Sequence, residues 1–450
     1  MGKYFGTDGV RAVAGQFPLT DDFIEKLGFC ALTEMKAYAK RENLKLQVII
    51  ARDTRLSGPS ILQALSAGIR AAGADVLDMG ISTTPSVAYA VQHTGSVCGV
   101  VISASHNPPE FNGIKFFSSK GSKLPEELEN IIEDAIEKTT QVSEATGTYR
   151  QAPELVTAYK NFLASTVDSA LVKGTKVVLD CANGASYQIA PDVFRMLGMQ
   201  VITLADKNDG ALINKDVGAL HTEKMQARVV EEKADIGFSF DGDADRVIAS
   251  DENGRQLDGE YIISSSALAL HAAGKLPGNK AVLTVMANLG CINYLKDKGV
   301  EVALTPVGDK YVSRVLAQEG LAVGGETSGH IIFPQLLATG DGILSALQFL
   351  QFAKKSGLPV SQFAGTWTKY PAVLRAIKVQ SKPALENLPG FAEGIKDLEN
   401  KLGGKGRVYV RYSGTEPKLR ILVEGEDEAL VNQIADGAEA LYWSKTEAKK

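Results

Sequence analysis

The stretch KLQVIIARD, at residues 45–53, decides how most of the chain is interpreted. An apolar run of this length that ends in polar residues is typical of a buried strand leading into a loop. A helical stretch follows, and AGADVL at 72–77 then supplies a glycine stop and a second apolar run. The segment therefore predicts a strand, a loop, a helix and a second strand.

The same pattern occurs twice more. The second copy begins with KVVLDCANG at 176–184 and ends with LGMQVI at 197–202, and the third begins with KAVLTVMANLG at 280–290 and ends with KGVEVA at 298–303. Each copy is typical of a βα unit that contributes to a mostly buried sheet. The three copies predict three similar α/β domains.

The C-terminal part of the chain follows a different pattern, which predicts a smaller α+β domain. We expect a strand at 371–380, a helix at 384–401, strands at 407–411 and 419–424 around a polar loop, a closing helix at 426–443, and a frayed polar tail at 444–450.

Length and composition limit the classes of protein that fit. A chain of 450 residues exceeds one ordinary hydrophobic core, so several domains are expected. The net charge of −5 argues against a generally basic nucleic-acid surface, and no apolar run is long enough to span a membrane. The start lacks the apolar core of a signal peptide. The four cysteines form no C-x-x-C pair, which fits a reducing cytoplasm without disulfides or a zinc site.

The first loop that carries chemistry lies within GVVISASHNPPEFNGIKFF, at residues 99–117. A buried strand at 100–102 would deliver Ser105 and His106 at its C-terminal end, where ligands collect in open α/β sheets. A hydroxyl beside an imidazole is a candidate nucleophile. A Ser/Asn/Pro turn that merely ends a strand would have the same composition. No G-x-S-x-G elbow surrounds the serine, which disfavours an α/β-hydrolase.

The second loop, DGDADR at 241–246, lies between apolar strands at 236–240 and 247–249. Three carboxylates this close repel one another unless a hard divalent cation neutralises them, and acids without nearby Cys or His favour Mg²⁺. An EF-hand is rejected, although Glu252 occupies its twelfth position, because Arg246 replaces the required glycine. A solvated acidic turn is the simpler alternative.

Two more loops suit the recognition of a polar ligand. GGETSGH at 324–330 offers groups that can bind sugar hydroxyls, although a glycine-rich turn without a ligand has the same composition. RYSGTEPKLR at 411–420 combines two arginines, two hydroxyls and a glycine, which suits a phosphate, although a basic hairpin is the alternative. Neither a Walker A loop nor a dinucleotide fingerprint is present. Together the four loops indicate phosphoryl chemistry on a phosphorylated polyol.

These loops, in this order, resemble the α-D-phosphohexomutase superfamily over nearly the whole chain. KYFGTDGVR at 3–11, DCANGASY at 180–187 and the segment 325–330 resemble the branch that acts on glucosamine phosphate. The resemblance implies three related α/β domains with mixed sheets and a smaller C-terminal α+β domain around a central cleft. The implied domains are 1–153 with the phosphoserine loop, 154–255 with the metal loop, 256–368 with the sugar-recognition loop and 369–450 with the phosphate-binding loop.

The resemblance also implies an activity and its requirements. Glucosamine 6-phosphate and glucosamine 1-phosphate would be interconverted through a phosphoserine and a bisphosphate, supplying UDP-N-acetylglucosamine synthesis in the cytoplasm. The expected cofactors are Mg²⁺ and hexose 1,6-bisphosphate as an activator. The expected partner is a small-molecule sugar phosphate, and a homodimer is compatible with the resemblance. Binding to nucleic acid or to a membrane is not expected.

Residue by residue, the resemblance implies four groups in the site. The catalytic candidates are Ser105, Arg11, Lys115 and His330; the metal ligands are Ser105, Asp241, Asp243 and Asp245; the substrate contacts are His106, Arg246, Gly308, Glu326 and Ser328; and the phosphate clamp is Arg411, Ser413, Gly414, Thr415 and Arg420. Which candidate acts as the general base is left open.

Three positions depart from the superfamily pattern. Ala244 replaces the commoner glycine, and its β-carbon disfavours a positive φ, so a reshaped metal loop is expected. Tyr412 stands where proline is common, and Thr327 stands where many relatives carry Gln or Asn. Thr327 bears most on the identity of the sugar. A phosphomannomutase or phosphoglucomutase, a catalytically silent phosphosugar-binding protein, and a phosphatase that loses its phosphoryl to water are the alternatives.

Overall fold

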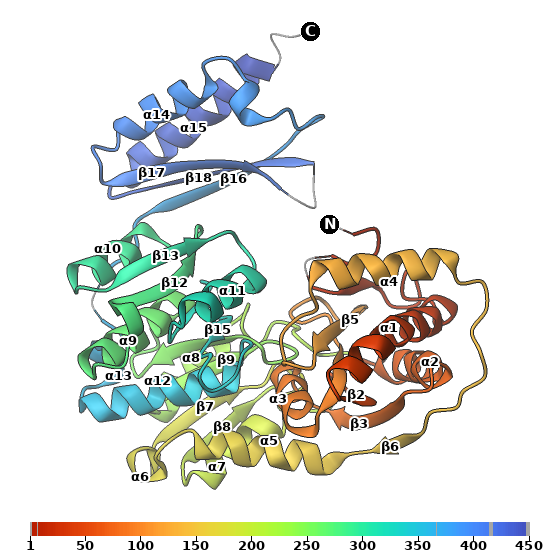
Figure 1. Cartoon of the computed structure of the whole chain (residues 1–450). Helices are drawn as coiled ribbons and strands as arrows, with labels where there is room; N and C mark the ends of the chain where they lie inside the picture. The colour runs from red at the N-terminus through yellow and green to blue at the C-terminus, as the bar shows by residue number, and fades with distance from the viewer. Residues whose placement is uncertain (1, 7, 366, 414–416, 447–450) are drawn as a thin grey trace. The chain divides into compact units, whose positions relative to one another are not determined.

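The computed structural model describes residues 2–6, 8–365, 367–413 and 417–446, and its strands form four sheets (Figure 1). The chain divides into two compact units. The first comprises Met1–Met286 with Val300–Gly365, and the second comprises Ala287–Gly299 with Thr366–Lys450. Each unit is described by itself.

The first sheet is mixed, with the strand order β1-β5-β4-β2-β3-β6. Its strands are β1 Val10–Val13, β2 Lys45–Arg52, β3 Asp75–Ile81, β4 Ser96–Ile102, β5 Phe111–Ser118 and β6 Tyr149–Gln151. The helices of this region are α1 Asp21–Arg41, α2 Gly58–Ala71, α3 Thr84–Thr94, α4 Glu126–Lys138 and α5 Pro153–Ser165.

Strand β2 shows how this sheet is buried on both faces. Successive side chains of a strand point to opposite faces. Val48 and Ile50 pack in the core that includes α1, α2 and α4, whereas Ile49 and Ala51 pack in the core that includes α3 (Figure 1). Because both faces are covered, the strand is almost continuously apolar, and this is the pattern from which the sequence predicted it.

The second sheet has the order β11-β10-β9-β7-β8. Its strands are β7 Lys176–Asp180, β8 Gln200–Leu204, β9 Ile236–Phe240, β10 Val247–Asp251 and β11 Gln256–Leu257, and the helices of this region are α6 Ser169–Val172, α7 Ile189–Met196 and α8 Glu223–Glu232. The antiparallel strands β9 and β10 pair directly, with Phe240 opposite Val247. The acidic loop is therefore the turn of a fully buried hairpin.

The third sheet has the order β13-β12-β14-β15. Its strands are β12 Lys280–Thr284, β13 Glu301–Thr305, β14 Gly324–Gly325 and β15 Ile331–Ile332, and the helices of this region in the first unit are α9 Gly259–Ala272, the 3₁₀ helix η1 Pro277–Asn279, α11 Asp309–Glu319, α12 Gly342–Ser356 and α13 Val360–Phe363.

The predicted βα repeat is confirmed in all three copies. The strand pairs β2/β3, β7/β8 and β12/β13 are each parallel, and a helix joins the two strands of each pair in the chain. The repeat therefore reflects one local rule applied three times: a buried strand, a connecting helix and a return strand parallel to the first.

The second unit contains an antiparallel sheet with the order β16-β18-β17. Its elements are β16 Ala372–Lys378, β17 Gly406–Tyr412, β18 Lys418–Gly425, α10 Leu289–Asp297, the 3₁₀ helix η2 Leu385–Asn387, α14 Phe391–Asn400 and α15 Glu428–Thr446. Alternate residues of β18, Leu419, Ile421 and Val423, pack in one core with Val431 and Ala435 of α15.

The largest differences from the prediction in this unit concern two helices. The helix expected at 384–401 is broken, because Gly390 takes a φ of 69° after Pro389, and α14 starts only at Phe391. Proline lacks the N–H that a helix interior needs, and left-handed backbone interrupts the helix. The fraying expected from residue 444 is also wrong as far as Thr446, because α15 continues to that residue. Residues 447–450 lie outside the described part.

Among the described residues, no helix is both long enough and apolar enough to cross a bilayer.

Candidate active site

Ser105 occupies an unusual backbone position directly after β4. Its φ of 53° lies in the left-handed region, which is costly for residues other than glycine, and its residual exposure is 1%. Its N–H donates to Ser103 Oγ at 2.9 Å. Strained backbone persists where its surroundings over-determine it, and it is concentrated at functional sites.

A buried arginine fixes the serine loop. The Arg55 guanidinium is fully buried and pairs with Asp53 at 2.9 Å. It also donates to the backbone oxygens of Ser105 at 3.0 Å, Asn107 at 2.7 Å and Phe111 at 2.8 Å. The Arg55 guanidinium thus donates hydrogen bonds to several backbone carbonyls of this turn, which would be costly to bury without donors.

Three carboxylates from the β9–β10 turn face this loop. Asp241 and Asp243 are fully buried and Asp245 nearly so, and one ligand oxygen from each lies within 4.8 Å of the others. Ser105 Oγ donates to Asp241 Oδ2 at 2.7 Å. The structure therefore brings together the four residues predicted as metal ligands.

The donor set fits a hard divalent cation. Asp243 Oδ1 and Asp245 Oδ1 are buried, and neither accepts a hydrogen bond from any residue that the structure describes. Buried carboxylate oxygens without donors are costly, and oxygen ligands are those that Mg²⁺ prefers. Ala244 takes a φ of 57°, so the turn adopts the left-handed backbone despite the β-carbon that was expected to disfavour it.

Proton affinity differs sharply within the acidic cluster. Burial, together with the charges of Asp245 and Asp243, raises the pKa of Asp241 well above its usual range. Burial alone would also raise the pKa of Asp245, but the cations of Lys115, His330 and Arg246 outweigh it and hold that pKa well below the usual range. A bound cation would relieve the repulsion that separates these two groups.

Lys115 places a buried positive charge against the acidic turn. Its Nζ lies 2.7 Å from Asp243, 3.0 Å from Asp8 and 3.6 Å from Asp245. Burial would lower the pKa of Lys115, but the three carboxylates outweigh it and the pKa is raised. Lys115 therefore stays charged and supplies electrostatic stabilisation in this arrangement, rather than accepting a proton.

A cleft of about 250 Å³ opens beside these groups. Its walls include Asp8, Arg11, His106, Lys123, Asp245, Arg246, Gly308, Asp309, Tyr311, Glu326 and His330. Six of the residues predicted to be catalytic or to contact substrate therefore line one cleft: Arg11, His106, Arg246, Gly308, Glu326 and His330. Ser328 is in the same loop as Glu326 but is exposed and is not among the lining residues.

The pKa values of the two histidines of the cleft are shifted in opposite directions. Burial and the cations of Arg246 and Arg11 lower the pKa of His106 to about 4, and its Nδ1 lies 3.2 Å from Ser105 Oγ. Burial would also lower the pKa of His330, but Asp245 and Asp309 outweigh it and the pKa is raised. His106 is therefore neutral, whereas His330 is the better proton donor.

The loop at 324–330 is held from two sides. Glu326 Oε1 accepts the N–H of Gly308 at 3.0 Å, and the N–H of Glu326 donates to the carbonyl of His330 at 3.0 Å. Thr327 donates its hydroxyl to the carboxylate of Glu260, at the start of α9. Thr327 is therefore tied to α9 and does not line the cleft.

The predicted phosphate clamp lies in the second unit. Arg411 of β17 and Arg420 of β18 are direct cross-strand partners, so their side chains leave the same face of the sheet. The N–H of Ser413 donates to the carbonyl of Lys418 at 2.8 Å and closes the hairpin. Gly414 and Thr415 lie outside the described residues.

Sequence reasoning missed several residues of the site. Thr84 donates to Asp243 Oδ2 at 2.5 Å, and Asp8, Lys123 and Asp309 line the cleft. Asp8 could have been found, because it lies in the opening segment that carries the resemblance. Lys123 and Asp309 had no local signal, since each is one charged residue in a polar stretch and their meeting depends on the fold.

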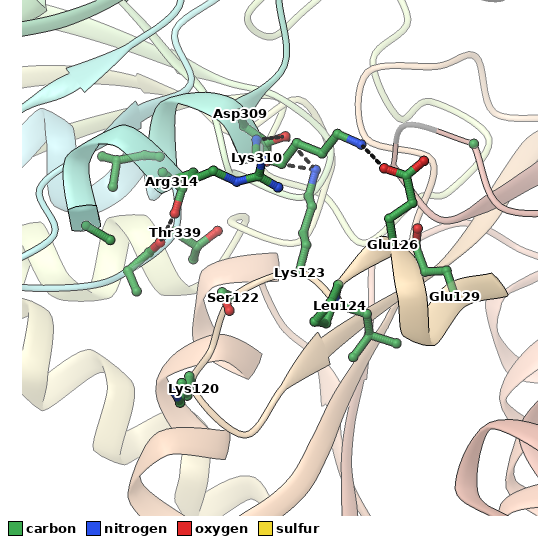
Figure 2. Close-up of a pocket in the computed structure, with 16 residues that line it drawn as sticks. Lys120, Ser122, Lys123, Leu124, Glu126, Glu129, Asp309, Lys310, Arg314 and Thr339 are labelled. Atoms are coloured by element: carbon green, nitrogen blue, oxygen red, sulfur yellow. Dashed lines mark hydrogen bonds and ion pairs between the residues drawn. The ribbon is translucent and has the colours of Figure 1, made fainter. Parts of the chain in front are cut away.

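A second cavity lies beside Lys123 and Asp309. Its volume is about 410 Å³, and the loop before α4, α4 itself and α11 contribute to its walls (Figure 2). Lys123 and Asp309 face each other there, and Lys310 reaches Glu126 at 3.7 Å (Figure 2). Both cavities share the Lys123–Asp309 pair as part of their walls.

Comparison with protein families gives four matches that together span most of the chain. Phosphoglucomutase/phosphomannomutase α/β/α domain I matches residues 2–143, domain II matches 156–254 and domain III matches 258–370. The C-terminal domain of the same family matches residues 374–440.

Curated relatives are similar over nearly their full length. A phosphoglucosamine mutase of Caldicellulosiruptor bescii is 42% identical, with 99% of this chain and 100% of the relative covered. Phosphoglucosamine mutases of Desulforamulus reducens and Brevibacillus brevis are each 44% identical, with 97% of this chain and 98% of each relative covered.

Solved structures share the fold at lower identity. A phosphoglucomutase/phosphomannomutase family protein from Burkholderia thailandensis gives a TM-score of 0.80 at 22% identity, covering 99% of this chain and 98% of that one. An N-acetylphosphoglucosamine mutase of Aspergillus fumigatus, in complex with GlcNAc-6P and magnesium, gives 0.68 at 20% identity, covering 98% and 96%.

The half-buried Glu129, at the second cavity, provides a pH-dependent test of the structure. Burial raises the pKa of Glu129 from 4.5 to about 7. The folded state therefore binds this proton more tightly than the unfolded chain, and stability that is complete below pH 4.5 is lost as the pH rises through about 7. At pH 8, Glu129→Gln should be more stable than the parent by on the order of 1 kcal/mol, a figure reduced for solvent screening.

Urea unfolding at pH 5 and pH 8 measures this effect. The exposed neighbour Glu127 provides the matched control through Glu127→Gln, whose difference from the parent should stay near zero at both values. Equal responses of the two variants would contradict the burial of Glu129.

Proposed function

The chain belongs to the phosphoglucomutase/phosphomannomutase family, and on that premise we propose that it interconverts glucosamine 6-phosphate and glucosamine 1-phosphate through a phosphorylated Ser105. The full-length similarity to phosphoglucosamine mutases supports this choice of sugar within the family. GlcNAc-6P bound to the Aspergillus fumigatus mutase supports the class of ligand.

One observation carries the proposal: the Ser105 hydroxyl lies 2.7 Å from Asp241, inside a buried triad of carboxylates. A hydroxyl placed only for stability has no need of three buried acids. A pure phosphosugar-binding protein would need neither the serine nor the triad.

The residues that would hold Mg²⁺ are Asp241, Asp243 and Asp245, together with an oxygen on Ser105. When bound, the cation supplies charge neutralisation for the transferring phosphoryl group. The orphaned oxygens of Asp243 and Asp245 support this assignment. The magnesium in the complex of the Aspergillus fumigatus mutase is consistent with it.

The proposed reaction has two phosphoryl transfers. In the first, the bond from phosphorus to Ser105 Oγ breaks as a bond to a sugar hydroxyl oxygen forms; the hydroxyl loses its proton and the serine oxygen gains one. The resulting bisphosphate turns over, and its other phosphoryl returns to Ser105 by the reverse exchange. A catalytic amount of hexose 1,6-bisphosphate would phosphorylate Ser105 at the start.

The cleft supplies charge and orientation for both transfers. Lys115 and Arg246 hold positive charge beside the acidic turn, as phosphoryl transfer requires. Arg11 lines the same cleft, and His330 is placed to give or take a proton at the sugar oxygen. Glu326 would accept hydrogen bonds from sugar hydroxyls, with Gly308 holding its carboxylate in place.

The non-reacting phosphate is assigned to the second unit. Arg411, Ser413 and Arg420 would bind it, because the two arginines are cross-strand partners and guanidinium groups are well suited to bind phosphate. Gly414 and Thr415 complete this proposed clamp from the sequence alone. The cytoplasm is the proposed compartment, since the four cysteines are buried and form no disulfide within the described residues.

The decisive assay compares glucosamine 6-phosphate, glucose 6-phosphate and mannose 6-phosphate, each with Mg²⁺ and catalytic hexose 1,6-bisphosphate. We expect the highest kcat/KM for glucosamine 6-phosphate, and Ser105→Ala should lose at least about 1,000-fold because the acceptor oxygen is gone. Asp258→Asn, at a helix cap, serves as a control for general damage to the fold.

Each other outcome has a definite meaning. Preference for glucose or mannose phosphate would keep the chemistry and replace the substrate. Release of inorganic phosphate faster than isomerisation would indicate a phosphatase. Full activity in Ser105→Ala would overturn the phosphoserine mechanism.

The anchoring of Thr327 predicts a separable effect on sugar binding. Thr327→Val keeps the side-chain shape but removes the hydroxyl that donates a hydrogen bond to Glu260. The loop that contains Glu326 should therefore loosen. KM for the sugar phosphate should rise about 5-fold, as expected for one lost hydrogen bond, and kcat should change less. Steady-state kinetics measure this, with Thr327→Ser as the control that keeps the hydroxyl. Equal KM values in the two variants would contradict the anchor.

A further inference from the structure

The charged residues of the cleft form two groups that lie on different parts of the fold. The first centres on Asp8, which pairs with Arg11 and lies 3.0 Å from Lys115. The second centres on Asp309 at the start of α11, whose Oδ2 lies 3.5 Å from His330 Nε2. The catalytic candidates Arg11, Lys115 and His330 therefore each lie within ion-pair distance of one of these two carboxylates.

A single ammonium joins the two groups. Lys123 Nζ lies 2.6 Å from Asp8 Oδ1 and 2.7 Å from Asp309 Oδ2. Lys123 belongs to the loop between β5 and α4, whereas Asp309 starts α11, so the pair connects the first sheet region to the third. His330 also lies 3.7 Å from Asp245, and Lys115 lies 3.6 Å from the same aspartate, which closes the connections into a ring.

We propose that Lys123 is a positioning residue. By pairing with both Asp8 and Asp309, it keeps Arg11 and the buried Lys115 aligned with His330. This inference rests on the proposed phosphoryl transfer for its kinetic consequence. The bridge itself follows from the contacts of Lys123 with Asp8 and Asp309 and does not depend on the reaction.

The electrostatics show why the bridge matters. Burial would lower the pKa of Lys123, but Asp309 and Asp8 outweigh it and the pKa is raised, so the bridge stays charged. Without that charge, the two half-buried carboxylates would face each other and repel. The walls would then separate, or each carboxylate would take a new partner from the catalytic candidates.

The position of Lys123 favours alignment over direct substrate binding. Two carboxylates already take up its ammonium within 2.7 Å, and the same pair forms a wall of the second cavity (Figure 2). A residue that bound substrate phosphate would have to give up these contacts, and its loss would raise KM. A residue that aligns reacting groups lowers kcat when it is lost, since a misplacement of about 1 Å can cost about 100-fold.

The test compares Lys123→Met with Lys120→Met. Lys120 lies three residues earlier in the same loop, is exposed, and makes no side-chain hydrogen bond or ion pair within the described residues (Figure 2). For Lys123→Met we expect kcat to fall about 100-fold with KM within about 3-fold of the parent. Lys120→Met should match the parent in both. A rise in KM with kcat intact would overturn the proposal in favour of direct binding.

Asp309→Asn provides the second variant and the coupling measurement. If Lys123 and Asp309 act through one bridge, the double variant should lose no more kcat than the worse single variant. Losses that multiply would contradict the bridge, as would a kcat unchanged in both single variants.

Amide hydrogen exchange gives a readout that does not depend on catalysis. In Lys123→Met we expect faster exchange at residues 308–312 and 9–12, at a melting temperature close to that of Lys120→Met. Unchanged exchange in these segments would overturn the positioning role. An inactive parent on all three sugar phosphates would refute the proposed function, and the exchange measurement would still decide whether Lys123 holds the two walls.

Discussion

The burial of three carboxylates beside a serine hydroxyl is the constraint that organises the first unit. Asp241, Asp243 and Asp245 lie almost wholly out of water, in a turn between two buried strands. Burying even one uncompensated charge is expensive, so cations must converge on the turn. Lys115 and Arg246 do so from within the protein, and the orphaned oxygens leave room for one more positive charge.

The serine side of the site depends on the same principle applied to the backbone. Ser105 takes a left-handed conformation in a buried turn, and its neighbouring carbonyls need donors. Arg55 supplies several of them, and Asn214 adds a hydrogen bond of 2.8 Å to the carbonyl of Ser105. The hydroxyl is therefore aimed at Asp241 before any ligand arrives. Preorganisation of this kind removes much of the cost of aligning a phosphoryl group with its acceptor.

The sequence predicted elements whose signal is local and missed those that depend on distant partners. Apolar runs identified β2, β7 and β12 because both faces of these strands are covered. Ser105 and the aspartates were found as separate loops on two different sheets, and only the folded structure shows Ser105 Oγ 2.7 Å from Asp241. Lys123 and Asp309 carried no signal, because their role exists only where they meet. The break before Phe391 had a signal in Pro389 and Gly390, which was outweighed by the apolar periodicity around it.

A crystal of the protein soaked in Mn²⁺, a cation with oxygen preferences close to those of Mg²⁺, tests the central claim most directly, because its anomalous scattering locates the ion without reference to activity. The account predicts one strong peak within coordination distance of Ser105 and the carboxylates of Asp241, Asp243 and Asp245. Absence of a peak there, in a crystal that shows Mn²⁺ bound elsewhere, would contradict it.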